Sequence, residues 1–218
     1  MANVMIKSRE DIHRNDRKSY RLIKRVFDVS FSAAALILLA LPMALITVMI
    51  KLESPGPAIF VHNRFGKNGS PLPLLKFRTM HMNAEKMIDT FTPEQKKEWE
   101  QNFKLENDPR ITKIGGFLRR TSLDELPQFI NILKGELTLV GPRPIVEEEL
   151  ERYGSEKEKF LSVTPGLTGY WQAYARSNCT YEQRMEMELY YVDHANFWWD
   201  IKIIFATVGA VLSRRGAK

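Results

Sequence analysis

Two adjacent carboxylates, Asp124 and Glu125, form a candidate reaction centre. Ser122 lies three residues before Glu125, a spacing typical of a helix capping box, and Pro127 is tolerated only near the start of a helix. The pattern therefore predicts a helix that begins at about this serine, with Asp124 in its first turn. The helix dipole and the upstream guanidinium of Arg119 would keep Asp124 ionised at neutral pH.

An ionised, positioned carboxylate can act as a nucleophile or bind a metal ion. The alternative is structural: Ser122 and Glu125 cap the helix, and Asp124 is a surface charge. Arg143 favours chemistry, because the prolines on both sides of it stiffen its turn. A rigidly held guanidinium is suited to binding a phosphate group.

The helix predicted after the acid pair has two faces. Apolar residues recur at helical spacing on one of them: Leu126, Phe129, Ile130 and Leu133. Gln128 and Asn131 continue the face that carries Asp124. We expect the first face to pack against the rest of the protein and the second to be free for polar interactions.

Composition limits the class of protein. With 218 residues, 44% hydrophobic and 27% charged, the chain can form one compact domain plus an appendage. A single cysteine, Cys179, excludes an intramolecular disulfide, and the four scattered histidines do not predict a zinc site. The net charge of +6 predicts an anionic partner. The chain has no recognisable nucleic-acid-binding motif, so we expect a membrane surface or phosphorylated substrates instead.

The N-terminal part predicts a membrane helix. Residues 1–25 are basic, and residues 29–50 contain no charge over more than the roughly 18 residues that a membrane helix needs. Basic residues lie on both sides of this run, for example Arg25 and Lys51, and Pro42 interrupts it. This pattern favours a re-entrant helix that bends at Pro42 and returns to the same side. The alternative is an ordinary tilted span.

The remaining pattern predicts mostly helices. Residues 59–61 and 74–80 are expected to form a β-hairpin, and helices are expected over about 92–103, 113–119, 181–192 and 197–212. The last helix carries Trp198 and Trp199, which favour a position in the membrane interface. The alternative is a buried core helix.

Three runs, SLDELPQ at 122–128, NILKG at 131–135 and VGPRP at 140–144, resemble the signature of the bacterial sugar transferases, or monotopic phosphoglycosyl transferases. Residues 24–28 resemble the opening motif of that family. The resemblance implies a mostly helical α+β fold in three parts. These are a basic segment at 1–25, a re-entrant membrane helix at 26–52 and a cytoplasmic catalytic domain at 53–218, with an interfacial helix near 197–212.

The resemblance also implies a reaction: transfer of a sugar 1-phosphate from a nucleoside diphosphate sugar, expected to be a UDP-sugar, to polyprenyl (undecaprenyl) phosphate. Such a step starts the assembly of an exopolysaccharide, a capsule, an O-antigen or a protein-linked glycan. The expected partners are these two substrates, the cytoplasmic leaflet of a bacterial plasma membrane and, as an open alternative, a second copy of the chain. The rival interpretation is a non-catalytic membrane-associated adaptor, which would tolerate Asp124→Asn.

Roles for single residues follow from the same resemblance. Asp124 and Glu125 are the catalytic pair, and either is expected to hold Mg²⁺. The residues expected to bind phosphate oxygens are Arg119, Arg143 and Arg176. Asp200 matches a further acidic position, and Pro42 is the break in the membrane helix.

Overall fold

A computed structural model describes residues 9–102, 105, 107–175 and 179–213 of the chain. The longer helices are α1 (Arg9–Glu53), α2 (Pro93–Asn102), α3 (Lys113–Thr121), α4 (Gln128–Lys134), α8 (Tyr181–His194) and α9 (Phe197–Leu212). Shorter helical turns are η1 (Lys67–Gly69), η2 (Lys86–Thr90), η3 (Leu123–Glu125), α5 (Glu147–Leu150), η4 (Glu151–Glu156), α6 (Lys157–Leu161) and α7 (Tyr170–Tyr174). The strands are β1 (Ile59–Phe65), β2 (Pro71–Phe77), β3 (Thr138–Val140) and β4 (Gly166–Thr168). The predicted mostly helical α+β class is confirmed.

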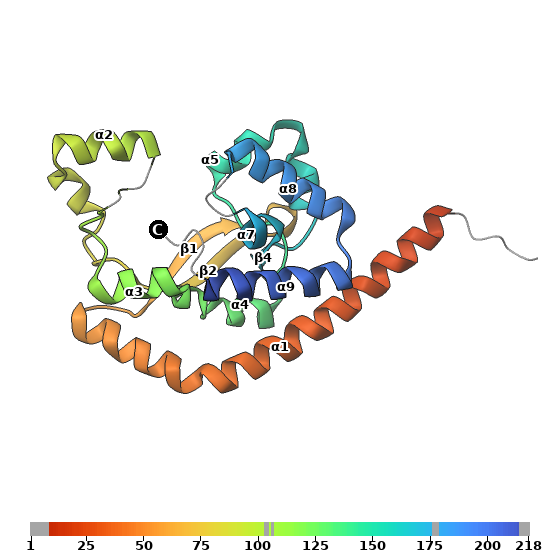
Figure 1. Ribbon diagram of the computed structural model, residues 1–218, viewed down its shortest axis with the longest axis horizontal. Helices are drawn as coiled ribbons and strands as arrows, with labels where there is room; N and C mark the ends of the chain where they lie inside the picture. The colour runs from red at the N-terminus through yellow and green to blue at the C-terminus, as the bar shows by residue number, and fades with distance from the viewer. Residues whose placement is uncertain (1–8, 103–104, 106, 176–178, 214–218) are drawn as a thin grey trace, which may run out of the picture.

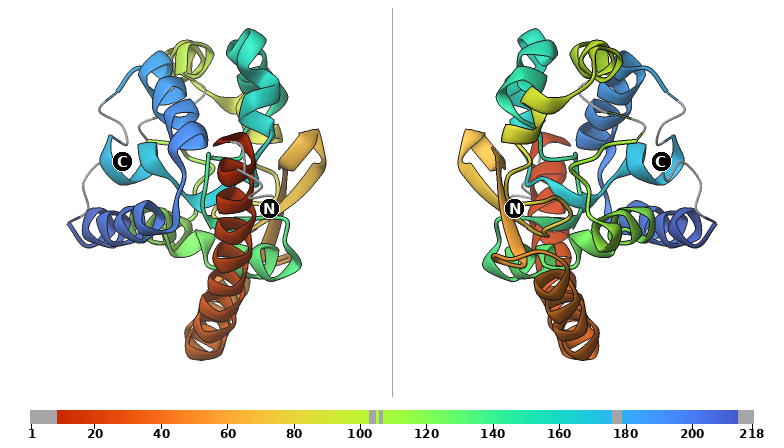
Figure 2. Two further views of the ribbon diagram at one scale, coloured as in Figure 1. Left: turned by 90° about the vertical axis from the view of Figure 1, so that its right-hand side faces the viewer. Right: turned by 90° about the vertical axis from the view of Figure 1, so that its left-hand side faces the viewer.

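Helix α1 passes beneath the rest of the protein and bends on the way (Figure 1). Pro42 lies inside it, and a proline that removes one helical hydrogen bond is an ordinary cause of such a bend. The part from 18 to 53 has a mean hydropathy of 2.6 over its most apolar window, of which 11% is buried. The middle of α1 projects beyond every other element (Figure 2), with Ile37, Leu38 and Leu41 largely exposed.

Charged residues fasten the first half of α1 to the globular part. Lys24 forms an ion pair of 2.6 Å with Asp200 of α9. Arg25 donates to two backbone carbonyl oxygens at the end of α4, and Asp28 accepts hydrogen bonds from the first two residues of β3. The helix is longer than expected, because the basic segment from residue 9 onward continues it.

The other end of α1 is fastened to the same globular part. Glu53 accepts hydrogen bonds of 2.7 and 3.0 Å from the first two backbone N–H groups of α3. Arg78, which follows β2, donates to the hydroxyl and carbonyl of Ser54 and to the carbonyl of Pro57. Both ends of α1 therefore contact one body.

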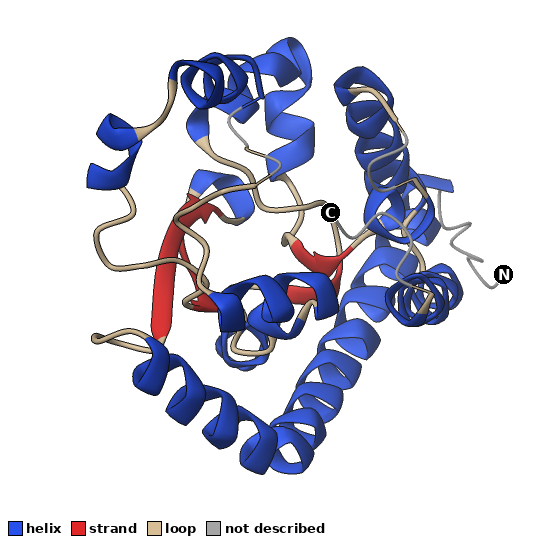
Figure 3. Cartoon of the chain, turned by 60° about the vertical axis from the view of Figure 1, so that its left-hand side comes forward, coloured by secondary structure: helices blue, strands red, loops and turns tan. Residues whose placement is uncertain are grey.

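Two small sheets lie among the helices (Figure 3). β1 and β2 pair antiparallel from Ile59 opposite Phe77 to Phe65 opposite Pro71, which confirms the predicted hairpin with a shorter turn. β3 and β4 pair in parallel, with Thr138 opposite Gly166. The sequence analysis did not predict this second sheet, because each strand is only three residues long and its partner lies far along the chain.

The main core joins β2, α4, β3 and α9. Its fully buried members include Leu72, Ile132, Val140 and Ile203. Asn131 is also fully buried, and its side chain bonds the backbone of β2 at two points, 2.9 and 3.0 Å away. The expectation that the face carrying Gln128 and Asn131 is free for polar work is thus wrong in general, since both residues are buried and Asn131 fastens α4 to β2.

Candidate active site

The acid pair lies at a break between two helices. α3 ends at Thr121, and Ser122 takes a left-handed conformation (φ 58°) that closes that helix. Asp124 and Glu125 then form one 3-10 turn before α4 begins. The predicted capping box is therefore wrong: Ser122 makes no side-chain cap to the following turn and instead ends the preceding helix.

The Asp124 carboxyl is partly buried. Burial and the adjacent charge of Glu125 raise its pKa to about 6, against the opposing effects of Lys76 and Arg119. The sequence pattern led us to expect an ionised carboxylate at neutral pH, and this raised pKa is still below 7. At pH 7 the ionised form still exceeds the protonated form by about tenfold, so Asp124 remains available as a nucleophile.

Glu125 faces a lysine from the hairpin. Its Oε1 lies 2.7 Å from the Nζ of Lys76 on β2. Burial disfavours the charged form, but Lys76 and Arg143 outweigh it and hold the pKa of Glu125 below its usual range. Lys76 and Arg78 alternate with apolar residues along the chain. Only tertiary contacts show that Lys76 faces the acids and that Arg78 instead fastens the end of α1.

Arg119 is on the last turn of α3, close enough to Asp124 to favour its charged form. Its Nε donates to the hydroxyl of Thr79, 2.9 Å away. The backbone of Thr79 is packed directly on Gly115 of α3. The segment after β2 thus sets the position of the arginine relative to the nucleophile candidate.

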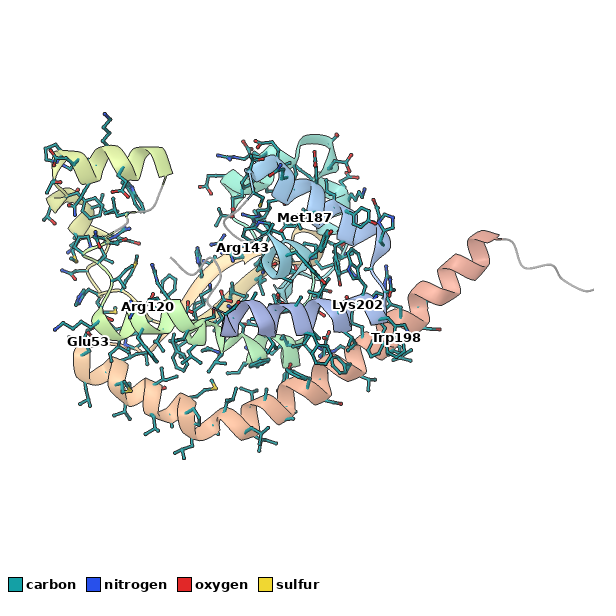
Figure 4. The ribbon with its side chains drawn as sticks, in the orientation of Figure 1. Glu53, Arg120, Arg143, Met187, Trp198 and Lys202 are labelled. Atoms are coloured by element: carbon teal, nitrogen blue, oxygen red, sulfur yellow. The ribbon has the colours of Figure 1, made fainter. Side chains whose placement is uncertain are left out.

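Arg143 is held by its backbone. Its N–H donates to Oε1 of Glu188 on α8 over 3.2 Å, and the same carboxylate accepts from the hydroxyl of Tyr153. Arg184 lies 3.6 Å from Glu188. Glu188 is 2% exposed, so the turn that carries Arg143 is bonded to a buried side chain. Arg143 itself lies near the centre of the view in Figure 4.

The surroundings of the acid pair are strongly cationic. His62 shows this most clearly, because burial and the charges of Arg64, Lys76 and Arg143 lower its pKa to about 4. The imidazole is therefore neutral at pH 7, and of its three cationic neighbours Arg64 is also paired with Glu149, 3.2 Å away. Arg64 was not among the predicted site residues; it lies within β1, beyond the residues expected to form the strand.

Part of this site lines one cleft, whose walls include Arg64, Lys76, Glu125, Gln128, Arg143 and Gln172. Asp124, which precedes Glu125 in the chain, and Arg119 are not among the lining residues of the cleft. It encloses ≈ 10 Å³, which is room for about one water molecule. The side-chain oxygen of Gln172 is buried and has no hydrogen-bond partner among the residues that the structure describes. The side chain of Gln128 lies close enough to Glu125 to favour its charged form. The cleft therefore combines cations for an anion with a polar group that is open to a ligand.

The other predicted site residues do not join this cleft. Asp200 is 4% exposed and accepts hydrogen bonds from Tyr20, Lys24 and Tyr191, so its carboxylate connects α9 to α1 and α8. Arg176 lies outside the described residues. Pro42 lies in the exposed half of α1.

The acid pair has the chemistry of a magnesium site. Mg²⁺ is usually held by one or two carboxylates together with water and substrate phosphates. Asp124 and Glu125 supply two adjacent carboxylates, and their mutual repulsion raises the pKa of Asp124, which a divalent cation would relieve. In the part of the chain that the structure describes, no three acidic, histidine or cysteine side chains gather into a complete metal site. The substrate would have to complete the coordination.

Comparisons with known proteins identify relatives of the chain. The undecaprenyl-phosphate galactose phosphotransferase of Salmonella typhimurium is 44% identical over 204 residues, 92% of this chain and 43% of that protein. The exopolysaccharide production protein ExoY of Rhizobium meliloti is 41% identical over 199 residues, 90% of this chain and 88% of that protein. The UDP-glucose:undecaprenyl-phosphate glucose-1-phosphate transferase of Escherichia coli is 40% identical over 197 residues, 86% of this chain and 40% of that protein.

The chain thus spans less than half the length of the Salmonella and Escherichia relatives and most of the length of ExoY. A model of the family described as bacterial sugar transferase matches residues 19–214, which include α1, the hairpin and the cleft at the acid pair. The chain belongs to the bacterial sugar transferase family.

Proposed function

We propose that the chain transfers a sugar 1-phosphate from a UDP-sugar to polyprenyl phosphate, giving a polyprenyl diphosphate sugar and UMP. The acceptor is undecaprenyl phosphate, and the product starts the assembly of a surface polysaccharide or a related glycan. The names of the relatives support the two substrate classes. The observation that carries the proposal is a partly buried, adjacent carboxylate pair surrounded by Lys76, Arg119 and Arg143.

The charges at the site explain why two steps are favourable. Both substrates carry phosphate groups that repel each other, and a covalent intermediate separates their binding in time. In the first step an oxygen of Asp124 bonds to the phosphorus that carries the sugar, and the bond from that phosphorus to the oxygen of UMP breaks. In the second step an oxygen of polyprenyl phosphate attacks the same phosphorus and releases the carboxylate.

The remaining groups position the substrates and neutralise their phosphate charges. Arg119 and Arg143 are placed to bind phosphate oxygens, and Arg176 is proposed to join them. Lys76 bonds Glu125 and lowers the pKa of Asp124, so it keeps the nucleophile charged. Mg²⁺ held by Asp124 and Glu125 would neutralise the diphosphate and stabilise the departing UMP. Asp200 is proposed to act through the fold, by holding α9 against α1.

We also propose that α1 enters one leaflet and returns, with the globular part on the cytoplasmic face. The apolar middle of α1 is exposed and bent, and both of its ends bond to the same body. A straight span of about 20 residues would place its ends about 30 Å apart on opposite sides of the bilayer. The contacts of Lys24 and Glu53 with the globular part support a helix whose two ends stay on one side of the membrane.

The test of the reaction is UMP release from a panel of UDP-sugars with Mg²⁺, with and without polyprenyl phosphate, in nanodiscs. We expect lipid-dependent turnover with one sugar, and a loss of roughly 10⁴-fold in Asp124→Asn. Asp193→Asn, an exposed carboxylate on α8, is the matched control and should keep full activity. Normal turnover by Asp124→Asn would remove its assignment as nucleophile and favour a non-catalytic adaptor.

A further inference from the structure

A second cavity lies apart from the acid pair. It encloses ≈ 220 Å³ and shares no lining residue with the cleft that contains Glu125. Its walls come from the first half of α1, the turn η1, the end of α4, strand β3 and the loop before β4. The turn η1 is the tip of the β1–β2 hairpin. The cavity is far larger than the single water that the acid-pair cleft encloses.

Its polar lining is mostly cationic. Arg21, Lys24 and Arg25 come from α1, and Lys67 comes from η1. Lys24 is paired with Asp200, and Arg25 is bonded to backbone carbonyls of α4. Arg21 and Lys67 have no ion-pair partner among the residues that the structure describes, so two cations on facing elements are free to bind an anion.

The acidic group in the lining does not cancel this charge. Asp28 is 3% exposed, and both of its carboxylate oxygens accept hydrogen bonds from β3. The lining also includes the apolar side chains of Leu137, Val140 and Val163. The cavity thus combines cationic with apolar groups, which matches an amphiphile with an anionic headgroup better than a free inorganic ion.

The position of the cavity along α1 indicates where such a ligand comes from. Leu22, Ile23 and Val26 on the same stretch of helix are 50 to 67% exposed, and the charge-free run begins at Val29. If α1 enters the bilayer as proposed above, the cavity lies where the helix leaves water. Basic pockets at that level bind lipid headgroups.

We propose that this cavity binds the phosphate headgroup of an anionic membrane phospholipid, with Arg21 and Lys67 as its ligands and Leu137 and Val163 against its glycerol and first methylenes. The lipid is a structural ligand that connects α1 to the hairpin and is distinct from the polyprenyl acceptor. The inference depends on the membrane association of α1 but not on the reaction at Asp124.

The experiment measures retained lipid by native mass spectrometry. The full chain is purified from nanodiscs that contain equal amounts of phosphatidylglycerol and phosphatidylcholine. We expect the wild type and Asp124→Asn to retain one phosphatidylglycerol. The double variant Arg21→Gln/Lys67→Gln should bind it about thirtyfold more weakly, whereas Lys96→Gln/Lys97→Gln, with the same loss of charge on exposed α2, should bind it normally.

Two further variants separate a cavity from general surface attraction. Val163→Trp and Ser162→Phe fill the cavity without a change in charge, and Ser162 is exposed, so its variant should fold. Both should lose the lipid while keeping the thermal unfolding midpoint of the lipid-free wild type. Retention of phosphatidylglycerol by both folded variants would overturn the cavity as the site.

Competition identifies the source of the phosphate. We expect neither glycerol 3-phosphate nor inorganic phosphate to displace phosphatidylglycerol at millimolar concentration. Displacement by either would assign the cavity to a soluble phosphate compound, and displacement by polyprenyl phosphate would assign it to the acceptor. Displacement by any of these three compounds would overturn the proposal. Equal retention of phosphatidylcholine would overturn it as well. Because lipid retention is measured without turnover, an inactive enzyme would leave the result intact.

Discussion

Among single residues, Lys76 has the widest influence on the acid pair. It bonds Glu125 at 2.7 Å and lowers the pKa of both carboxyls. Asp124 must be ionised to attack phosphorus, and its pKa is raised to about 6, so activity should be lost as the pH falls through that value. The dependence on pH therefore reports the burial of Asp124 and the charge of Glu125, which Lys76 and Arg119 oppose.

We predict that Lys76→Met moves the acidic limb of the kcat/KM profile upward by about one pH unit. The physical reason is that the removed cation favours the charged form of Asp124. Lys96→Met on α2 is the control and should leave the limb unchanged. An unshifted limb in Lys76→Met, measured as UMP release between pH 5 and 9, would show that Lys76 does not act on the nucleophile.

At the scale of the elements, one glycine sets how closely α3 approaches the segment after β2. A methyl group at Gly115 would lie 2.0 Å from the carbonyl oxygen of Thr79, whereas one at Gly116 would come no closer than 3.4 Å to the flexible end of Arg120. Both glycines are in the same helix. Alanine substitutions at the two glycines therefore separate the effect of helix propensity on stability from the effect of packing.

We predict that Gly115→Ala destabilises the protein by about 2 kcal/mol, because backbone must move to admit the methyl group. Gly116→Ala should instead stabilise it by about 1 kcal/mol through helix propensity. Thermal or chemical unfolding measures both. Since Thr79 also bonds Arg119, Gly115→Ala should in addition lower kcat/KM; equal stability of the two variants would refute the close approach.

Helix α8 positions the turn of Arg143 through Glu188. We predict that Glu188→Gln lowers stability by about 2 kcal/mol, because Arg184 and Tyr153 lose a charged partner. It should raise KM for the UDP-sugar more than it lowers kcat, since the loosened turn binds phosphate less well. Glu186→Gln, exposed on the same helix, is the control. A loss of stability with unchanged KM would make Glu188 a structural residue only.

For the whole molecule, the topology of α1 decides where the cleft lies relative to the lipid. We predict that Lys18→Cys and Lys51→Cys, made in a Cys179→Ser background, react with an impermeant maleimide from the same side of the membrane. Leu41→Cys should be shielded from both sides, although it is exposed on the protein itself. The measurement compares intact cells with inverted membrane vesicles.

Labelling of Lys18→Cys and Lys51→Cys from opposite sides would contradict the re-entrant helix. It would also require the tethers at one end of α1 to be broken, since Lys24 and Glu53 both bond to the globular part. Activity of each variant in vesicles is the check that the fold is kept.

The sequence by itself determined what depends on neighbours along the chain. The hairpin and the helices expected over about 92–103, 181–192 and 197–212 were predicted because hydrophobic period and helix-start residues are local signals. The acid pair and the turn of Arg143 were found in the same way, since their motifs are contiguous. The long apolar run also identified α1 without any tertiary information.

Only the tertiary structure decided which of these residues meet. Lys76 and Glu125 lie 49 positions apart, Arg143 and Glu188 45 apart, and Lys24 and Asp200 176 apart. The break at Ser122 was not predicted, because a serine can end one helix in a left-handed conformation or cap the start of the next, and the sequence around it is the same in both cases. Pairing across such distances depends on packing of the whole core, and that is why the pKa of Asp124 and the use of Asp200 could not be deduced from the order of residues.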